Sequence, residues 1–224
     1  MEAIVFDFDG LVLDTETCSF TSVAAAFAEH GAELDRGWWQ HEILGTAEHP
    51  HWTVFLVERA TLPVADLDAV QRRRLEQHHA LVAQEVVRPG VVALLDEAEA
   101  AGIPCAVASS SAHAWVDGHL ERLGLLHRFA AVRCRDDVAE GRTKPAPDLF
   151  VAACEAVEAD PGASVALEDS PNGVTGAVAA GLTVVGVAAG MTEGLPLLGA
   201  HRVVSSLEEV TLADLAALLA EHHS

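Results

Sequence analysis

Six short apolar segments recur along the chain, and helical patterns separate most of them. Each segment is continuously apolar rather than alternating, which is typical of strands buried on both faces of a parallel sheet. Such strands are predicted at residues 3–8, 104–108, 130–133, 164–167, 182–187 and 202–204. The helical patterns lie at residues 90–101, 112–123, 147–157, 171–180 and 211–220. This alternation predicts an α/β fold with a doubly wound, Rossmann-like parallel sheet.

The long segment between the first and second predicted strands contains no convincing strand of its own. Residues 16–87 instead carry helical patterns, including residues 38–44, 53–59 and 64–84. Pro89 and Gly90 follow this segment and mark the return to the sheet, because both residue types interrupt regular structure. We therefore expect an α/β core made of residues 1–15 and 88–224, with an α-helical cap domain of residues 16–87 inserted after the first strand.

Two groups of large side chains in the insert have simple structural interpretations. Trp38, Trp39 and Trp52 are spaced as expected for the insert's own core, although an aromatic surface for a sugar is the alternative. Residues 72–74 are all arginine and are expected on a solvated helix face.

The charge balance limits the partners of the chain. It has 34 acidic residues against 13 Lys and Arg, a formal net charge of −21. Nucleic acid and membrane surfaces are therefore not expected partners, and an anionic small substrate needs a locally neutralised site. The four cysteines are far apart, and the N-terminal segment lacks the basic residues of a secretion signal. We expect a cytoplasmic protein that is a monomer or a weak homodimer.

Acidic residues follow two of the predicted strands. Asp7 and Asp9 point the same way, because side chains alternate along an extended chain. Glu168 and Asp169 end another strand, and the carboxyl ends of parallel strands share the sheet edge where ligands bind. Carboxylates that converge need a cation, a shared proton or strong hydrogen bonds. A set of oxygen ligands without His or Cys suggests Mg²⁺, whereas the alternative is two unrelated, solvated acidic strand ends.

Two further features could bind an anion at this edge. Lys144 is the only lysine in a chain whose other basic residues are all arginine, which suggests a site that needs a compact ammonium group. Ser109, Ser110 and Ser111 lie between a strand and a helix, where hydroxyls and free helix amides can bind an anion. A chance surface lysine and an ordinary helix N-cap are the alternative interpretations.

Four motifs in this order resemble those of the haloacid dehalogenase-like (HAD) phosphohydrolase superfamily, and the resemblance covers the whole chain. The motifs are Asp7-x-Asp9-Gly10-Leu11-x-x-Asp14-Thr15, Ser109, Lys144-Pro145 and Glu168-Asp169-Ser170-x-x-Gly173. The helical insert resembles the cap of the subgroup that contains β-phosphoglucomutase and small sugar-phosphate phosphatases.

The resemblance implies a role for each motif residue. Asp7 would be the nucleophile that forms a phosphoaspartate, and Asp9 would act first as a general acid and then as a general base. Mg²⁺ would be held by Asp7, by the backbone carbonyl of Asp9 and by Asp169, with Glu168 just behind them. The phosphoryl oxygens would be bound by Ser109, Ser110, Lys144 and the backbone amide of Gly10 or Leu11.

The sequence also narrows the reactions that this resemblance leaves open. Asp9 favours phosphoryl transfer over dehalogenation, since a halide leaves without a proton. Similar hydrolases that form a Schiff base use a lysine of the cap, and this chain has no lysine other than Lys144, so that reaction is not expected. β-Phosphoglucomutase is similar but carries an arginine near the place of Glu48 and His49, and a histidine near the place of Ser19. We therefore expect a Mg²⁺-dependent phosphatase for a small phosphorylated metabolite, a sugar or polyol phosphate. A phosphosugar mutase is the alternative, and the long insert disfavours a non-catalytic receiver-type switch.

Overall fold

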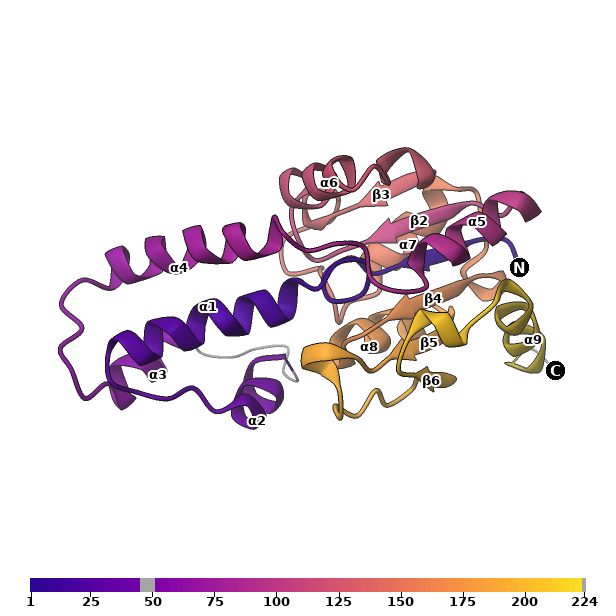
Figure 1. Ribbon diagram of the computed structural model, residues 1–224. Helices are drawn as coiled ribbons and strands as arrows, with labels where there is room; N and C mark the ends of the chain where they lie inside the picture. The colour runs from indigo at the N-terminus through magenta and orange to yellow at the C-terminus, as the bar shows by residue number, and fades with distance from the viewer. Residues whose placement is uncertain (45–50, 223–224) are drawn as a thin grey trace.

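The computed structural model describes residues 1–44 and 51–222, and within them six parallel strands form one sheet in the order β3-β2-β1-β4-β5-β6 (Figure 1). The strands are β1 (Ile4–Phe6), β2 (Cys105–Ala108), β3 (Ala131–Arg133), β4 (Val165–Glu168), β5 (Thr183–Val187) and β6 (Arg202–Val204). Each strand lies within or next to a predicted apolar segment. The prediction of a doubly wound parallel sheet is confirmed.

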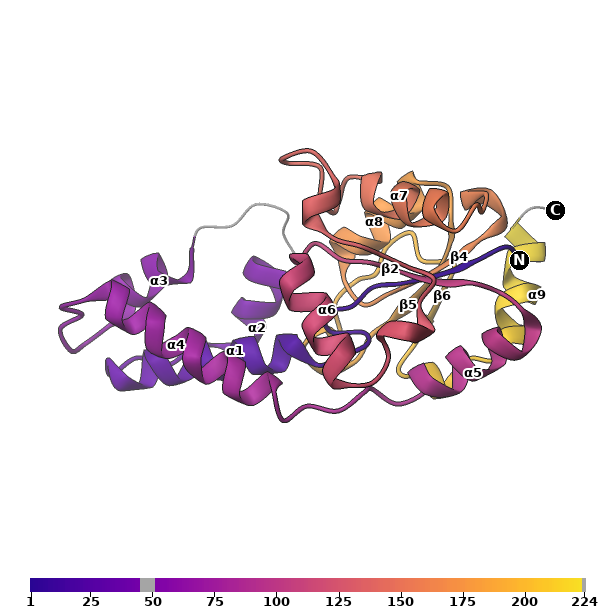
Figure 2. The same cartoon turned by 90° about the horizontal axis from the view of Figure 1, so that it is seen from above.

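Helices cover both faces of this sheet, as continuously apolar strands require. They are α5 (Val91–Ala101), α6 (His113–Arg122), α7 (Asp148–Ala156), α8 (Pro171–Ala179) and α9 (Leu212–His222). Ile4 and Phe6 of β1 pack in one apolar layer with α5, α6 and α9, whereas Val5 packs in a second layer with α7 and α8. Figure 2 shows α7 and α8 on one side of the strands and α5 and α6 on the other. Alternation along a single buried strand therefore separates the two layers.

The regular elements described between β1 and α5 are helices, apart from two isolated bridges at Leu13. Its elements are α1 (Thr15–Glu29), α2 (Arg36–Trp38), a π-helix (Trp39–Leu44), α3 (Trp52–Arg59) and α4 (Leu67–Val82). Helices α1 and α4 lie side by side and extend away from the sheet (Figures 1 and 2). A separate apolar core holds these helices together, and in it Phe27 and Leu56 are fully buried. Trp39 and Trp52 are buried in the same core, as expected from their spacing.

Two chain crossings connect the insert to the sheet, and they are bonded to each other. Asp14 accepts a hydrogen bond from the Thr17 amide at 3.0 Å and so caps α1, while it also forms a 3.1 Å ion pair with Arg88 on the returning chain. The Arg88 amide donates to the Val12 carbonyl at 3.0 Å. That the insert behaves as a separate cap domain of residues 16–87 stays a prediction.

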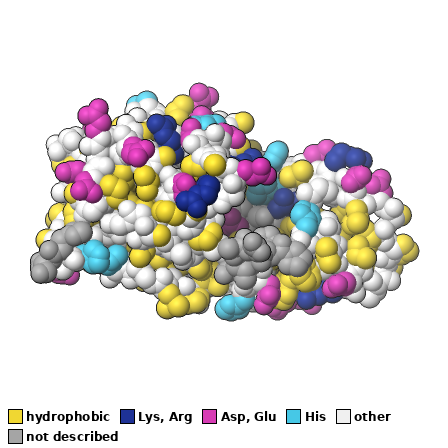
Figure 3. All heavy atoms as spheres, turned by 180° about the vertical axis from the view of Figure 1, so that it is seen from behind, with side chains coloured by type: hydrophobic (Ala, Val, Ile, Leu, Met, Phe, Trp, Pro, Cys, Tyr) yellow, Lys and Arg dark blue, Asp and Glu magenta, His cyan; other side chains and the backbone are white. Residues whose placement is uncertain are grey.

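The insert also contacts the sheet domain at a loop that follows β5. Gln40 donates from Nε2 to the Met191 carbonyl at 2.9 Å, and Arg36 donates to the Gly190 carbonyl at 2.9 Å. The Met191 side chain packs into the apolar core of the insert. On the face shown in Figure 3, acidic and basic side chains are scattered over both parts of the molecule rather than gathered in one patch.

Gly90 gives a test of how tightly the returning chain packs. It precedes α5 with a φ of +86°, and a Cβ atom there would lie 2.3 Å from the Leu207 carbonyl carbon and 2.4 Å from the Glu208 nitrogen. Gly102 also has a positive φ, of +68°, but a Cβ there would meet no atom within 4 Å.

We expect Gly90→Ala to lower the free energy of unfolding by more than Gly102→Ala does. Gly102→Ala should cost about 1–2 kcal/mol from the left-handed backbone alone, whereas Gly90→Ala adds a clash with backbone atoms that cannot rotate away. Urea unfolding of both variants measures the difference, and equal losses would contradict the packing argument.

Candidate active site

The site lies where β1 and β4 end side by side. The two strands pair in parallel with Phe6 opposite Leu167, and the Asp7 amide donates to the Leu167 carbonyl at 2.9 Å. The next residues on β1 and β4 therefore carry their carboxylates to the same edge. Strand order also reverses here, because the chain leaves β1 toward β2 and β3 and later returns to β4. Ligands of doubly wound sheets bind at such a switch point.

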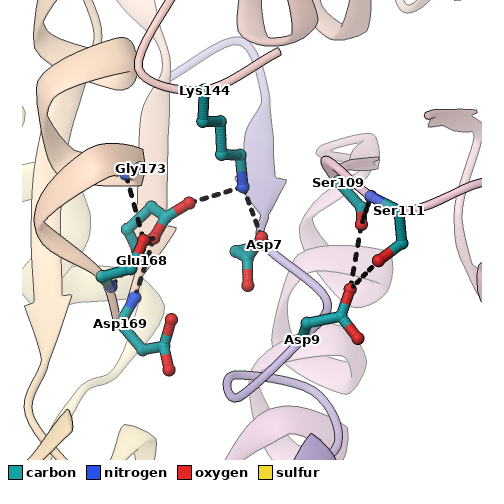
Figure 4. Close-up of polar contacts among 9 residues, drawn as sticks. Asp7, Asp9, Ser109, Ser111, Lys144, Glu168, Asp169 and Gly173 are labelled. Atoms are coloured by element: carbon teal, nitrogen blue, oxygen red, sulfur yellow. Dashed lines mark hydrogen bonds and ion pairs between the residues drawn. The ribbon is translucent and has the colours of Figure 1, made fainter. Parts of the chain in front are cut away.

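Three buried carboxylates meet at this point (Figure 4). Asp7, Glu168 and Asp169 each offer an oxygen atom within 4.8 Å of the others, and the residues are 6%, 0% and 3% exposed. Burial raises the pKa of Asp7 well above its usual value, with further raising by Glu168 and Asp9 against the opposing effect of Lys144. Burial and the neighbouring carboxylates of Asp7 and Glu168 likewise raise the pKa of Asp169.

Lys144 neutralises part of this acidic cluster. Its Nζ donates to Asp7 Oδ1 and, at 2.5 Å, to Glu168 Oε1, and its side chain is 6% exposed. Burial alone would lower the pKa of Lys144, but the two carboxylates raise it above its usual value, so the ammonium group keeps its proton. The predicted meeting of Lys144 with the strand-end acids is found in the structure.

Glu168 is occupied by other protein groups. While Oε1 binds Lys144, Oε2 accepts hydrogen bonds from the Asp169 amide at 3.0 Å, the Ser170 amide at 3.1 Å and the Ser170 hydroxyl at 3.0 Å. A Cβ atom on Gly173 would lie 1.9 Å from Glu168 Cδ, so this position has room only for glycine. Glu168 therefore orients the loop and lysine around it, and Asp7 and Asp169 are the more available ligands.

The donor set fits a divalent cation that prefers oxygen ligands. The cluster contains carboxylate oxygens only, and their burial together with mutual repulsion makes added positive charge favourable. Gly10 lets the backbone after Asp9 approach Asp169 closely, because a Cβ atom at Gly10 would lie 2.0 Å from Asp169 Oδ2. The Asp9 side chain is not part of the cluster, and only its backbone carbonyl is predicted to contribute.

Asp9 points toward a different group of residues. Its Oδ2 accepts hydrogen bonds from Ser109 Oγ at 3.2 Å and Ser111 Oγ at 2.7 Å (Figure 4). Its Oδ1 accepts a hydrogen bond from the Trp115 indole at 2.9 Å. Sequence reasoning identified Asp9 and the serines but missed Trp115, because it belongs to none of the four motifs.

The predicted phosphate-binding residues lie around the same edge. Ser110 and Lys144 line the cavity in front of the carboxylates, and Ser109 is buried behind them. The Gly10 amide donates to the Leu13 carbonyl at 2.8 Å and so takes part in a turn, which favours the Leu11 amide of the two predicted donors. Their binding of a phosphoryl group stays a prediction.

A cavity of about 820 Å³ connects these groups to the helical insert. The sheet side supplies the acids, Lys144 and the serines, whereas the insert supplies Glu16, Ser19, Arg74 and His78. A smaller cavity of about 310 Å³ adjoins it through Glu16 and Arg74 and extends toward the core of the insert. A ligand would therefore contact both parts of the molecule.

The expectation for Arg74 was wrong. Arg73 is exposed and pairs with Glu29, as a solvated residue does, but Arg74 lines the cavity and donates to Ser19 Oγ at 2.6 Å. Arg73 and Arg74 differ in this way although they are adjacent, because only one side of α4 faces α1. Sequence reasoning also missed Glu16 as a residue of the cavity. Glu48 and His49, where a difference from β-phosphoglucomutase was predicted, lie outside the described residues.

Comparisons with known proteins agree with this geometry. The sequence profile of the haloacid dehalogenase-like hydrolases matches residues 1–181. The chain is 35% identical over 222 residues to YhcW of Bacillus subtilis, a provisionally named phosphatase, with 99% of this chain and 97% of the relative covered. It is 28% identical to the phosphorylated carbohydrates phosphatase of Thermotoga maritima, with 91% and 93% covered. The chain belongs to the haloacid dehalogenase-like hydrolase family.

A solved structure supports the same assignment. CbbY from Rhodobacter sphaeroides, crystallised as a variant in complex with xylulose-(1,5)bisphosphate, superposes with a TM-score of 0.74 at 29% identity and covers 96% of this chain and 99% of that one. The predictions of the family, of the fold and of a phosphatase enzyme are confirmed by these comparisons. Among the described residues, none of the helices is long and apolar enough to cross a membrane.

Gly173→Ala tests the packing behind the acidic cluster. Gly173 lies in α8, where alanine would ordinarily stabilise the helix, yet its Cβ would overlap the Glu168 carboxylate. We expect a loss of about 1–3 kcal/mol in the free energy of unfolding. Gly118→Ala in α6 is the matched control, since no atom lies within 4 Å of its Cβ position. The control should be neutral or stabilising in thermal unfolding, and equal behaviour of the two variants would contradict the assignment.

Glu16 makes stability depend on pH. Burial and the carboxylates of Asp9 and Asp14 raise the pKa of Glu16 from 4.5 to about 7, against the opposing effect of Arg74. Between these values the folded protein holds a proton that the unfolded chain has lost. This contribution to stability is therefore present at low pH and is lost as pH rises from about 4.5 to about 7.

We expect Glu16→Gln to remove this contribution. The variant should gain stability relative to the wild type, by about 2–3 kcal/mol, as pH rises across that range. Urea unfolding at pH 5 and pH 8 measures the change. A constant difference between variant and wild type at both pH values would show that Glu16 does not titrate there.

Proposed function

We propose that this chain is a Mg²⁺-dependent phosphatase that hydrolyses a sugar or polyol phosphate through a phosphoaspartate on Asp7. The observation that carries the proposal is the pairing of a buried, charged Lys144 with Asp7 at the end of a large polar cavity, with Asp9 two residues away. In this proposal Asp7 is the nucleophile, Asp9 is the proton donor and Lys144 is the fixed cation, and all three line the same cavity.

In the first half of the reaction the chain transfers the phosphoryl group to itself. A carboxylate oxygen of Asp7 attacks phosphorus, the bond from phosphorus to the ester oxygen breaks, and Asp9 gives a proton to the departing alcohol. Lys144, Ser109 and the backbone amides of Leu11 and Ser110 bind the phosphoryl oxygens as negative charge shifts onto them.

In the second half a water molecule releases the phosphate. Asp9, now ionised, takes a proton from the water molecule as the water oxygen attacks phosphorus. The bond between phosphorus and the Asp7 carboxylate breaks. The carboxylate of Asp7 and the proton on Asp9 are thereby restored, and inorganic phosphate leaves. The walls contributed by α1 and α4 restrict bulk water, so that a positioned water molecule reaches the phosphoaspartate.

Mg²⁺ would be held by Asp7, Asp169 and the backbone carbonyl of Asp9, with Glu168 supporting the site from behind. When bound, it supplies positive charge that stabilises the pentacoordinate phosphorus and reduces the repulsion between nucleophile and phosphate. Oxygen-only ligands and the raised pKa values of Asp7 and Asp169 support this metal.

The size and lining of the cavity support a small, hydroxylated substrate. Hydrogen-bonding groups from the insert, Glu16, Ser19 and Arg74, face the strand-end acids across the cavity. Two of the similar proteins act on or bind phosphorylated sugars according to their names. We place the enzyme in the cytoplasm, which is supported by its four buried, unpaired cysteines.

Substitution of the two aspartates tests the mechanism. Asp7→Asn should lower phosphate release by at least about 1,000-fold, because an amide cannot serve as the nucleophile. Asp9→Asn should lower it by about 100-fold or more for an alkyl phosphate. Both variants should keep a cooperative unfolding transition, and substantial activity in Asp7→Asn would refute the covalent mechanism.

A substrate panel completes the test. Phosphate release is measured with Mg²⁺ and with EDTA on sugar, polyol and glycolate phosphates, and β-glucose 1-phosphate is followed by product isomer analysis. We expect metal-dependent release that is concentrated on a few esters. Isomerisation without release would replace the phosphatase with a mutase, and no reaction on any ester would refute the proposal.

A further inference from the structure

Trp115 is the one tryptophan of the chain that lies outside the helical insert, and it contacts Asp9 directly. It lies in α6, which begins just after Ser109, Ser110 and Ser111. The indole Nε1 donates to Asp9 Oδ1 at 2.9 Å, while Ser111 and Ser109 donate to Oδ2 at 2.7 and 3.2 Å. Three donors therefore hold both oxygens of the carboxylate that is proposed to move protons.

The three donors are not equivalent. A serine hydroxyl can rotate about its C–O bond and can accept as well as donate, and Ser109 Oγ already accepts from the Ser111 amide at 3.0 Å. An indole N–H only donates, and its direction is fixed by the ring. The orientation of the Asp9 carboxylate is therefore set most strictly by Trp115.

The indole ring is itself held by three imidazoles. His78 of α4 stacks on it with a centroid distance of 5.5 Å and an interplanar angle of 13°. His79 of α4 lies at 5.5 Å, and His119 of α6 meets the ring edge-on at 4.3 Å. Burial, together with Arg74, lowers the pKa of His78 to about 4, so this stacked imidazole is neutral near pH 7. Both parts of the molecule thus fix the direction of the N–H group.

We infer that Trp115 is a positioning residue for the proton transfers of Asp9, and that α4 assists it through the imidazoles packed on the indole. The inference rests on the proposed function, because it acts through the acid and base role of Asp9. A proton donor must lie within hydrogen-bond reach of the leaving oxygen in a reproducible orientation. Loss of the indole N–H should therefore impair reactions in proportion to their need for a proton.

Trp115→Phe tests this, since it keeps an aromatic ring and removes the donor. Two substrates are compared, glycerol phosphate, whose alkoxide needs a proton to leave, and 4-nitrophenyl phosphate, whose phenolate does not. The ratio kcat/KM reports the transfer to Asp7 and excludes the later hydrolysis. We expect a fall of about tenfold or more for glycerol phosphate and a change of less than about twofold for 4-nitrophenyl phosphate.

Two controls separate positioning from general damage. Trp38→Phe makes the same change on the surface of the insert core, where the ring packs on Phe55 and Arg59, and it should leave the two-substrate ratio unchanged. The double variant Asp9→Asn/Trp115→Phe is compared with Asp9→Asn alone. Because Trp115 acts through the Asp9 carboxylate, both variants should give the same burst of 4-nitrophenolate and the same rate with glycerol phosphate. A further loss in the double variant, or equal losses on both substrates in Trp115→Phe, would overturn the inference.

A spectroscopic measurement does not depend on the folding of Trp115→Phe. In protein labelled with ¹⁵N at the indole nitrogens, Asp9→Asn should move one indole N–H resonance and leave those of Trp38, Trp39 and Trp52 in place. The absence of such a shift would overturn the inference. An unaltered protein that hydrolyses neither ester would instead refute the proposed function, whereas an active protein in which Trp115→Phe changes nothing refutes the positioning role alone.

Discussion

The repulsion among three buried carboxylates is the interaction on which the arrangement of this molecule depends. The parallel pairing of β1 with β4 brings Asp7, Glu168 and Asp169 within 4.8 Å of one another, away from water. Charges so placed cost several kcal/mol each unless they are paired or hydrogen-bonded. Lys144 and the amides after Glu168 offset part of this cost, and the proposed cation would offset more of it when bound. The two glycines that touch the acids allow these compensating groups to approach.

The groups proposed for the chemistry and those proposed to face the substrate come from different parts of the chain. Every group proposed to act on phosphorus lies at the sheet edge, whereas Glu16, Ser19 and Arg74 reach the cavity from helices that have their own apolar core. The two parts meet through polar contacts such as the bond from Gln40 to the Met191 carbonyl, through the packing of the Met191 side chain in the insert core, and through the imidazoles of α4 that pack on Trp115. Changes in the insert at positions other than His78 and His79, which pack on Trp115, can therefore alter the lining of the cavity without disturbing the sheet edge.

Much of this arrangement could be predicted because it follows from local sequence. Buried parallel strands read as short apolar segments, and residues after such strands meet at one edge, so the meeting of Asp7 with Glu168 was foreseeable. The place of Lys144 beside them was expected only from the resemblance to the family, because Lys144 does not follow a strand directly. Helix boundaries were less so, since α4 begins at Leu67, where Asp66 caps it, rather than at residue 64. The π-helix at Trp39–Leu44 has no simple pattern. The partial burial of Arg74 and the contact of Trp115 with Asp9 arise from packing between distant segments, which local sequence does not encode.

The position of Lys144 has a consequence for chemical modification. It is the only side-chain amine in the protein, and it is buried as an ammonium between two carboxylates. Reagents and enzymes that acylate, alkylate or conjugate lysine therefore find no reactive side chain on the surface. A lysine introduced at an exposed position would be the sole lysine side chain open to such labels or cross-links, and could be derivatised while the amine of the acidic cluster stays protected.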